Sequence, residues 1–289
     1  MYVFIVNPVS GNGRGRRVWS RVEGWLMRYQ TPYQVHFTNA PGQAVELARS
    51  MIGRDIQAVV AVGGDGTVHE VGNALVDTGI PLGYIPAGSG NDFAQAQGIP
   101  LHPKQALHRV LRNQMKQMDT ARIGARSLIG FGGIGFDGQV AKAVNQSSFS
   151  RRLGRFAYLL GFLQTLKQYR PARVTLTTDG MEQVFEQVWL VAICNQPNYG
   201  GGMQICPGAR HDDGLLNLCC VHGLSKGGLI KLFPSVYKGR HTSHPSVLLL
   251  KGRRITLRSD PPLVIHTDGE IIGETPLSIE IHPRSLAVL

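Results

Sequence analysis

The sequence predicts two domains of different fold class, an α/β domain followed by an antiparallel β domain. In the first part, buried strands alternate with glycine-rich loops and helices, which is typical of a parallel sheet covered on both faces. Beyond about Asp119, short strands and turn pairs such as Asp179-Gly180 and Asp268-Gly269 dominate, which favours an antiparallel sandwich or barrel. We therefore expect domains over residues 1–121 and 122–281.

The first domain begins with a strand, a glycine-containing loop and a helix. The predicted elements are a strand at 2–6, a loop at 7–13, a helix at 15–29, a strand at 34–37 and a helix at 42–51. The loop is a poor match to a dinucleotide fingerprint, because GNGRG lacks the G-x-G-x-x-G spacing and Pro8 lies in the turn. Arg14 and Arg16 could still lie near a phosphate.

The stretch from Ala58 to Leu75 organises this domain. An apolar strand at 58–62 leads into a loop at 63–67 and then a helix, and Thr67 and Glu70 have the spacing of a capping box. Free N–H groups at such a helix start suit a phosphate, and Asp65 would repel that phosphate unless a divalent cation lay between them. The alternative is a tight turn without a ligand. The loop is not a P-loop, because no Lys-Ser/Thr follows the glycines.

A fourth strand, at 82–85, precedes the loop at 86–93. Ser89 and Asp92 again have capping-box spacing, which predicts a helix start. Loops that follow parallel strands meet at the carboxyl edge of the sheet, where ligands bind. Two of these loops carry an aspartate, Asp65 and Asp92, so we expect the site at this edge.

The second domain is predicted to consist mainly of strands, interrupted by helices. The strands are expected at 116–123, 128–132, 173–178, 184–194 and 215–222, with a further series from 247 to 281. Helical periodicity appears at 136–145, 149–169 and, more briefly, 226–237. The helix at 149–169 begins with a basic segment and has an apolar middle. It could lie on a membrane surface, but an ordinary helix covering a sheet is favoured.

The composition admits three kinds of partner for a basic chain. The formal net charge is +11 and the pI about 9.8, which would suit nucleic acid, an anionic membrane surface or phosphorylated substrates. Local clusters occur at 14–17 and 151–155. Because no zinc-finger, helix-turn-helix or RRM signature is present, we expect no nucleic-acid partner.

The start of the chain and its cysteines point to a cytosolic protein. MYVFIVNPVSG has no basic n-region or small-residue cleavage site, and no apolar run reaches transmembrane length. The four cysteines have no zinc or redox spacing, so we expect buried, reduced thiols. They are Cys194, Cys206, Cys219 and Cys220.

Five motifs in order then resemble a known family. They are NPVSG, VGGDGTVHEVGNAL, GYIPAGSGNDFA, PGARHDDGLLNL and HTDGE. Together they look like the diacylglycerol kinase catalytic family, in particular its soluble bacterial lipid kinases. GGDGT alone is shared with NAD kinases, whereas PAGSGNDFA with DDGLL is more specific. The resemblance implies a nucleotide domain like that of NAD kinase and phosphofructokinase, a β-sandwich domain, an active site between them, and a return of 282–289 to the first domain.

The resemblance also implies roles for residues of the first domain. Asp65 matches the acidic residue of the nucleotide and Mg²⁺ site, and Asp92 and Asp119 match further acidic positions near it. Asn12 stands where many members have lysine, so Arg14 or Arg16 would take the place of that cation. The positions that match ATP-contacting or neighbouring residues are Asn7, Thr38, Gly63, Gly64, Asp65, Gly66, Thr67, Val68, His69, Ser89, Asn91 and Asp92.

In the second domain, Asp268 matches the family's general base, and Glu270 would support that site or its metal. Taken alone, Asp268-Gly269 is most simply a hairpin turn. The side chain of Asp213, with the backbone carbonyls of Arg210 and Leu215, matches a structural Mg²⁺ site. The alternative is a solvated Asp-Gly turn.

The expected function is an ATP- and Mg²⁺-dependent transfer of phosphate to a lipid hydroxyl, with a diacylglycerol-like acceptor. We expect a cytoplasmic enzyme that meets its lipid at the inner membrane face, and the sequence allows a homodimer. One alternative is a soluble-substrate kinase of the NAD kinase type, although its Asn-Glu and Thr-Asp-Ala-Tyr motifs are not visible. The other is a nucleotide- or lipid-binding regulatory protein without turnover.

Overall fold

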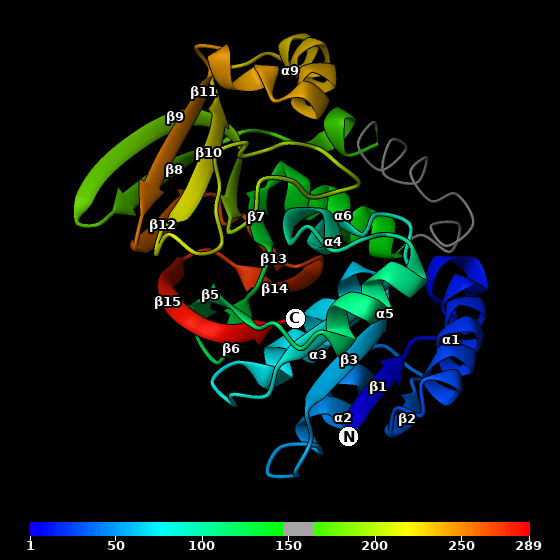
Figure 1. Cartoon of the computed structure of the whole chain (residues 1–289). Helices are drawn as coiled ribbons and strands as arrows, with labels where there is room; N and C mark the ends of the chain where they lie inside the picture. Colours follow the sequence, from blue (N-terminus) through cyan, green and yellow to red (C-terminus); the bar gives the residue numbers. More distant parts are fainter. Residues whose placement is uncertain (147–163) are drawn as a thin grey trace. The chain divides into compact units, whose positions relative to one another are not determined.

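The computed structural model describes residues 1–146 and 164–289, and the chain in it divides into two compact units (Figure 1). The first unit is Met1–Thr120 together with Pro283–Leu289, and the second is Ala121–His282. The sequence analysis put the boundary at residue 121, and the structure divides the chain between residues 120 and 121. The basic cluster at 151–155 lies outside the described residues.

The first unit is built on a parallel sheet in the order β15-β4-β3-β1-β2. The strands are β1 (Tyr2–Val6), β2 (Tyr33–Phe37), β3 (Ala58–Gly63), β4 (Leu82–Pro86) and the end of β15 (Leu277–Val288). Every residue of β1, β3 and β4 is buried, as the apolar runs predict for strands covered on both faces. The strands of the α/β domain are therefore confirmed.

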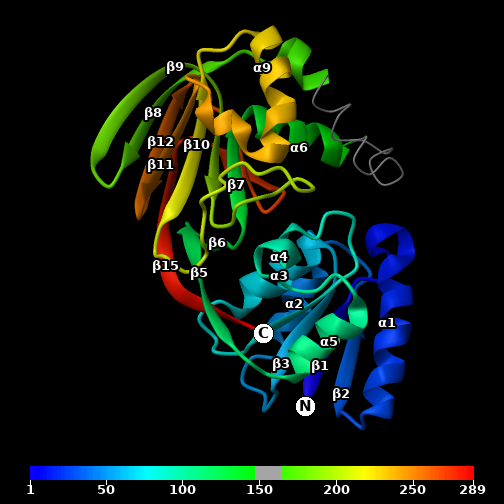
Figure 2. The same ribbon diagram turned by 45° about the horizontal axis from the view of Figure 1, so that its top comes forward.

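The described residues of this unit form five helices. They are α1 (Ser10–Arg28), α2 (Gln43–Arg49), α3 (Asp65–Leu75), α4 (Asp92–Ala96) and α5 (Pro103–Leu111). Helix α1 contacts α5, and α2 contacts α3; the two pairs lie on opposite sides of the sheet (Figure 2). Gly11, Asn12 and Gly13 have left-handed backbones, so regular helix begins beyond them, close to the predicted start at residue 15.

Both predicted capping boxes are wrong, because Glu70 bonds to the start of another helix and the residue before α4 is Asn91, not Ser89. The Glu70 carboxylate accepts the backbone N–H groups of Gly42 and Ala44, both at 3.1 Å, and so caps α2 instead of its own helix. Helix α4 begins after Asn91, whose own side chain does not cap it. The capping carboxylate there is that of Asp65.

The second unit is an antiparallel arrangement of the strands that the turn signals predict. They are β5 (Lys116–Ile123), β6 (Arg126–Leu128), β7 (Phe131–Gly135), β8 (Ala172–Thr178), β9 (Met181–Cys194), β10 (Leu216–His222), β11 (Val247–Gly252), β12 (Arg254–Asp260), β13 (Val264–Thr267), β14 (Glu270–Glu274) and β15. The single strand predicted at 128–132 is wrong. It is interrupted at Ile129 and Gly130, because their backbone N–H groups donate to the carboxylate of Asp268.

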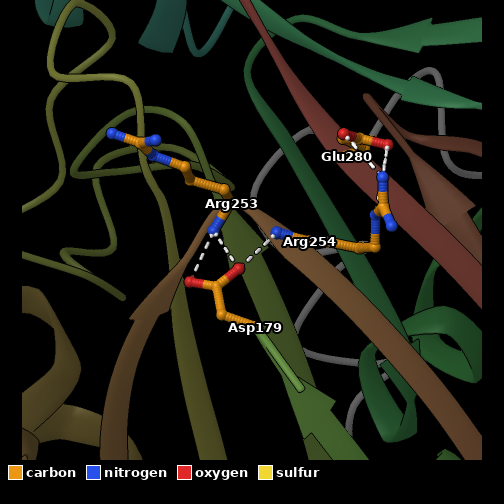
Figure 3. A network of polar contacts seen from close by, with 4 residues as sticks. All are labelled: Asp179, Arg253, Arg254 and Glu280. Carbon is orange, nitrogen blue, oxygen red and sulfur yellow. Dashed lines mark hydrogen bonds and ion pairs between the residues drawn. The ribbon is translucent and has the colours of Figure 1, made fainter. Parts of the chain in front are cut away.

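The Asp-Gly pairs make tight hairpin turns. Asp179 and Gly180 have φ values of 49° and 87°, and Asp268 and Gly269 have 49° and 89°, as two-residue turns of the primed type require. The Asp179 carboxylate also accepts the backbone N–H groups of Arg253 and Arg254 (Figure 3). Each hairpin is thus tied by its aspartate to a second part of the sheet.

The helices of the second unit are α6 (Phe136–Gln146), α9 (Lys226–Leu232), η1 (Phe233–Lys238) and η2 (Arg240–Ser243). The predicted helix at 149–169 lies largely outside the described residues, and only 164–168 are seen to be helical. The predicted contact of this helix, with a membrane surface or with a sheet, therefore falls largely on residues outside the described ranges. Among the helices that the structure describes, none has the length and apolarity needed to cross a membrane. All four cysteines are buried free thiols, as expected.

Candidate functional site

Three loops meet at the carboxyl ends of β1, β3 and β4 through direct backbone contact. A Cβ on Gly88 would stand 2.5 Å from the Cα of Gly64, and one on Gly11 would stand 2.4 Å from the carbonyl oxygen of Ala87. Both approaches are closer than any side chain permits, so the glycines at these positions are required by packing. The backbone N–H of Ala87 also donates to the carbonyl of Gly63 at 2.6 Å.

Asn7 and Thr67 join the first loop to the start of α3. The Asn7 Nδ2 donates to Thr67 Oγ1 at 3.2 Å, and the Asn7 backbone N–H donates to the carbonyl of Val62 at 2.9 Å. The first backbone N–H bond of α3 is made by Val68 to Gly64 at 3.2 Å, so the N–H groups before it are not used within the helix. A Cβ on Gly66 would meet nothing within 4 Å, so this turn faces open space.

The Asp65 carboxylate spans the second and third loops. Its Oδ2 accepts the backbone N–H of Asn91 at 2.8 Å, and its Oδ1 accepts that of Phe93 at 3.0 Å. The Asn91 side chain in turn closes the third loop, because its Oδ1 accepts the N–H of Gly88 at 2.9 Å. Asp65 therefore holds the loop geometry, a role that spacing in the sequence does not reveal.

Asp65 and Asp92 converge on Gly90. The point where a Gly90 Cβ would stand is 3.0 Å from Asp65 Oδ2 and 3.5 Å from Asp92 Oδ2. Because Gly90 has no side chain, two carboxylate oxygens border one small space beside the loop N–H groups. Each carboxylate oxygen has lone pairs beyond those used by one N–H donor, so this pair fits a divalent cation.

Tyr84 is a site residue that the sequence analysis missed. Its hydroxyl donates toward the carbonyl of Gly63 at 3.1 Å and Asn91 Oδ1 at 3.3 Å, under both loops. Burial, then the charges of Asp65 and Asp92, raise the pKa of Tyr84, while Arg14 acts in the opposite direction. Arg14 lies at the first loop, where a Cβ on Gly11 would stand 3.2 Å from the Arg14 Cβ. A polar tyrosine inside the apolar strand LGYIP was the available signal.

Other predicted nucleotide-contacting residues divide between the core and the surface. Val68 and His69 are buried, and the His69 ring packs edge-on against Phe93 with centroids 6.0 Å apart, so these side chains belong to the core. Ser89 is exposed at the third loop, and Thr38 is buried at the end of β2.

Asp119 is used within the framework of the first unit. Its carboxylate accepts the backbone N–H of Arg284 at 2.8 Å, and the neighbouring Thr120 hydroxyl bonds to Ser285. The structure thus gives Asp119 a place between β5 and β15, and the role near the metal stays a prediction from the resemblance.

In the second unit, the Asp268 carboxylate lies in a ring of backbone donors. It accepts the N–H groups of Ile129, Gly130 and Phe131 at 2.9, 2.9 and 3.0 Å. These donors fix the orientation of the carboxylate. Glu270 instead pairs with Arg126 at 3.0 Å on the exposed surface.

The predicted structural metal site forms an exposed turn. Arg210 pairs with Asp212 at 3.0 Å, an ion pair that lowers the pKa of Asp212, and Asp213 Oδ1 accepts the N–H of Leu215 at 3.1 Å. Asp213 has a second carboxylate oxygen, and Arg210 and Leu215 carry backbone carbonyls in the same exposed turn. Hard cations bind such a mixture of carboxylate and carbonyl oxygens, so the residues present fit the predicted ion. Clusters of three or more His, Cys, Asp or Glu side chains suited to a metal do not occur in residues 1–146 and 164–289.

Comparisons with known proteins cover both units. Residues 1–123 match the family model described as the diacylglycerol kinase catalytic domain, and residues 131–289 match that described as the YegS C-terminal NAD kinase beta sandwich-like domain. The match to the second model confirms the predicted β-sandwich class.

Individual relatives extend over nearly the whole chain. A diacylglycerol kinase of Mycobacterium tuberculosis (strain ATCC 25618 / H37Rv) is 31% identical over 99% of this chain and 93% of its own. One of Bacillus subtilis (strain 168) is 28% identical over 94% and 90%. The crystal structure of a diacylglycerol kinase from Bacillus anthracis str. Sterne has the same fold, with a TM-score of 0.77 and 22% identity over 99% of this chain and 95% of that one. The chain belongs to the diacylglycerol kinase family of lipid kinases.

Proposed function

We propose that this protein transfers the γ-phosphate of ATP to the hydroxyl group of a lipid, in a reaction that requires Mg²⁺. The observation that carries the proposal is the convergence of Asp65 Oδ2 and Asp92 Oδ2 beside the glycine loops. Mg²⁺ in phosphoryl-transfer sites is commonly held by one or two carboxylates together with substrate phosphates. The pair of aspartates supplies that number of protein ligands.

The loops of the first unit would hold the nucleotide. The unused N–H groups at the start of α3 point from a helix N-terminus, where phosphate binds favourably. Asn7 and Thr67 keep the first loop against this start, and Arg14 supplies a positive charge on the first loop. Arg14 is therefore our candidate for the cation that the sequence lacks at Asn12.

Bound Mg²⁺ would neutralise the phosphate charge that Asp65 and Asp92 would otherwise repel. The fit is supported by Asp65, whose two oxygens each accept one loop N–H and so keep lone pairs for a cation. Asp213, with the carbonyls of Arg210 and Leu215, would hold a second ion whose role is to stabilise the turn. Removal of that ion should lower stability more than it lowers turnover.

Asp268 would accept the proton of the lipid hydroxyl. Its three N–H donors fix the direction of the carboxylate, and a half-buried position leaves it accessible. Phosphoryl transfer depends mainly on positioning and electrostatics, so an oriented carboxylate suffices without unusual basicity. We assign Glu270 no more than support, through its exposed pair with Arg126.

The proposed acceptor is a diacylglycerol-like lipid, as the names of the relatives suggest. The enzyme would reach it from the cytoplasm by reversible contact with the inner membrane face. NAD is the competing acceptor from the soluble-kinase alternative.

The decisive assay follows labelled γ-phosphate from ATP to a panel of lipids in mixed micelles, with Mg²⁺ or EDTA, and with NAD as a soluble acceptor. A labelled lipid that forms only with Mg²⁺ is expected. Labelled NAD without labelled lipid would replace the proposal with the soluble kinase. Binding of ATP without transfer to any acceptor would favour a regulatory protein.

Asp268 has a matched control in the same chain, because Asp179 occupies the same type of turn and also accepts N–H groups of a neighbouring segment. Asp268→Asn should reduce kcat by about 10² to 10⁴-fold, the usual contribution of a general base. Asp179→Asn removes a similar structural contact and should leave kcat within about threefold. Equal losses in the two variants would reduce Asp268 to a structural residue.

A further inference from the structure

The charged side chains of the first unit are divided unevenly between the two sides of its sheet. Residues 10–32 and 98–118, which contain α1 and α5, include nine Lys or Arg and one acidic residue, Glu23. Residues 42–57 and 64–80, which contain α2 and α3, include two Arg and five acidic residues. The carboxylate of Glu23 is moreover occupied by the hydroxyl of Tyr33 at 3.1 Å.

Helices α1 and α5 form one continuous surface, which we call the α1–α5 face. The two helices are in contact, and Tyr29, just after α1, bonds to His108 of α5 at 3.0 Å (Figure 2). Val18, Trp19 and Leu26 bury the inner side of α1, so its charged side chains point outward. The exposed cations of this face, leaving aside Arg14 near the loops, are Arg16, Arg17, Arg21, Arg28, Lys104, Arg112 and Lys116.

A cavity of about 510 Å³ opens beside α5 on this face. Arg109, Arg112, Lys116 and His108 contribute to its wall. Arg109 is fixed in place, because its Nη1 donates to the carbonyl of Gly98 at 2.8 Å and its Nε to that of Leu289 at 3.1 Å. No acidic side chain lines the cavity, so its chemistry suits a negatively charged group of modest size.

Exposed apolar side chains stand among these cations. Met27 on α1 is 64% exposed, and Leu101 and Met115, on either side of α5, are 46% and 56% exposed. A bilayer interface takes up both kinds of group, cations at the anionic headgroups and apolar side chains below them. A nucleic acid would gain from the cations alone.

We propose that the α1–α5 face docks on an anionic lipid bilayer, with a phosphate headgroup in the cavity between Arg109, Arg112 and Lys116. The proposal deepens the proposed function, because it names the surface by which a lipid kinase would reach its lipid substrate. Only the purpose of the docking rests on the proposed function; the docking itself does not. The acidic side of α2 and α3 would be repelled from the same bilayer, so charge also orients the unit.

The test measures binding to vesicles without ATP, so it does not depend on catalysis. Vesicles of phosphatidylcholine, with and without about one third phosphatidylglycerol, are sedimented with the whole protein. Two double variants, Arg17→Gln/Arg21→Gln and Arg112→Gln/Lys116→Gln, are compared with Arg49→Gln/Arg54→Gln, which removes equal charge from exposed positions outside the face. Circular dichroism confirms that each variant is folded.

Each cation near an anionic surface contributes about fivefold to binding, so the two face variants should bind about 25-fold more weakly. The control variant should change binding by less than about threefold, and raising salt from about 0.1 to about 1 M should release the wild type. Equal losses in all three variants, or no preference for anionic vesicles, would overturn the proposal.

Two competitors identify other occupants. Displacement of the protein from vesicles by inorganic phosphate at millimolar concentration would assign the cavity to a free anion. Tighter binding to a DNA duplex than to the vesicles would assign the face to nucleic acid. Either result overturns the proposal. In mixed micelles of neutral detergent, the face variants should phosphorylate lipid as the wild type does. If no lipid is phosphorylated there but the vesicle result holds, the proposed function fails while the docking surface stands.

Discussion

The Asp65 carboxylate accepts the backbone N–H of Phe93, 28 residues further along the chain, at 3.0 Å. A side chain in the first turn of α3 therefore caps α4. Its second oxygen accepts the N–H of Asn91 in the same loop. One carboxylate therefore combines two functions, since the group we assign to the metal also holds the loop that carries Asp92.

Asp65→Asn should lower both phosphoryl transfer and stability. The amide replaces one acceptor oxygen with a donor that faces a backbone N–H, which should cost about 1–3 kcal/mol of unfolding free energy. We expect turnover to fall at least about 100-fold even at a temperature where the variant is folded. Urea unfolding and initial rates measure the two effects, with exposed Asp55→Asn as the control. Turnover equal to that of the wild type at limiting Mg²⁺ would contradict a direct role in metal binding.

Glu70→Gln should destabilise the first unit without a change in chemistry. The carboxylate accepts two N–H groups at the start of α2, and its loss should cost about 1–2 kcal/mol. Glu46→Gln changes an exposed acid on α2 itself and should cost less than about 0.5 kcal/mol. Thermal unfolding compares the pair. A smaller effect for Glu70 than for Glu46 would show that the cap contributes nothing.

The network in Figure 3 contains two carboxylates that should differ in their contribution to stability, a large one from Asp179 and a small one from Glu280. Asp179→Ala removes the acceptor for the N–H groups of Arg253 and Arg254 and should cost about 1–3 kcal/mol. Glu280→Gln breaks an ion pair with Arg254 whose side chains are 55% and 67% exposed, so it should cost less than about 1 kcal/mol. Urea midpoints for the two variants should rank in this order, and the reverse order would refute it.

His241 should make the protein less stable in mild acid. Burial lowers the pKa of His241 from 6.5, and while Nε2 bonds to the carbonyl of Ile205, buried Nδ1 has no partner among the described residues. The unfolded chain thus binds the proton more readily, so stability is lost as pH falls below 6.5 toward the folded-state pKa. His241→Gln should reduce the pH dependence of the unfolding free energy between pH 7 and 5. The reduction is measured relative to the wild type and to His102→Gln, a change at an exposed position. An unchanged slope would exclude His241.

The buried thiols should resist modification in the folded protein. Burial raises the pKa of Cys220 to about 12. The pKa of Cys206 is raised by its hydrogen bond to Cys194 and by burial. Reaction with a disulfide reagent at neutral pH needs an accessible thiolate, so fewer than about one thiol should react without denaturant. All four should react in guanidinium. Rapid reaction of two or more in the native protein would contradict this packing.

Local patterns predicted the strands and loops well, and failed wherever a side chain bonds to a distant segment. The apolar runs of β1, β3 and β4 and the glycine turns after them are local features, so their positions could be read directly. Glu70 also has the local spacing of a capping box. Its partners are Gly42 and Ala44, and that contact exists only because α2 packs against α3.

The same limit applies at the site. The split between β6 and β7 follows from the N–H groups given to Asp268, which is 138 residues from Gly130. The convergence of Asp65 with Asp92 could be expected from parallel strand order, but the role of Tyr84 depends on which face of β4 it occupies. Such long-range contacts cannot be predicted from the neighbouring residues, because they form only in the folded chain.

The return of residues 283–289 to the first unit has a consequence for biosynthesis. Val288 pairs with Leu82, and the N–H of Leu289 donates to the carbonyl of Leu82, so β4 is flanked on both sides only when β15 is in place. A ribosome delivers these residues after all of Ala121–His282. While the second unit is being translated, β4 remains an open strand edge, and chaperone protection in that interval would guard the nascent nucleotide unit against aggregation.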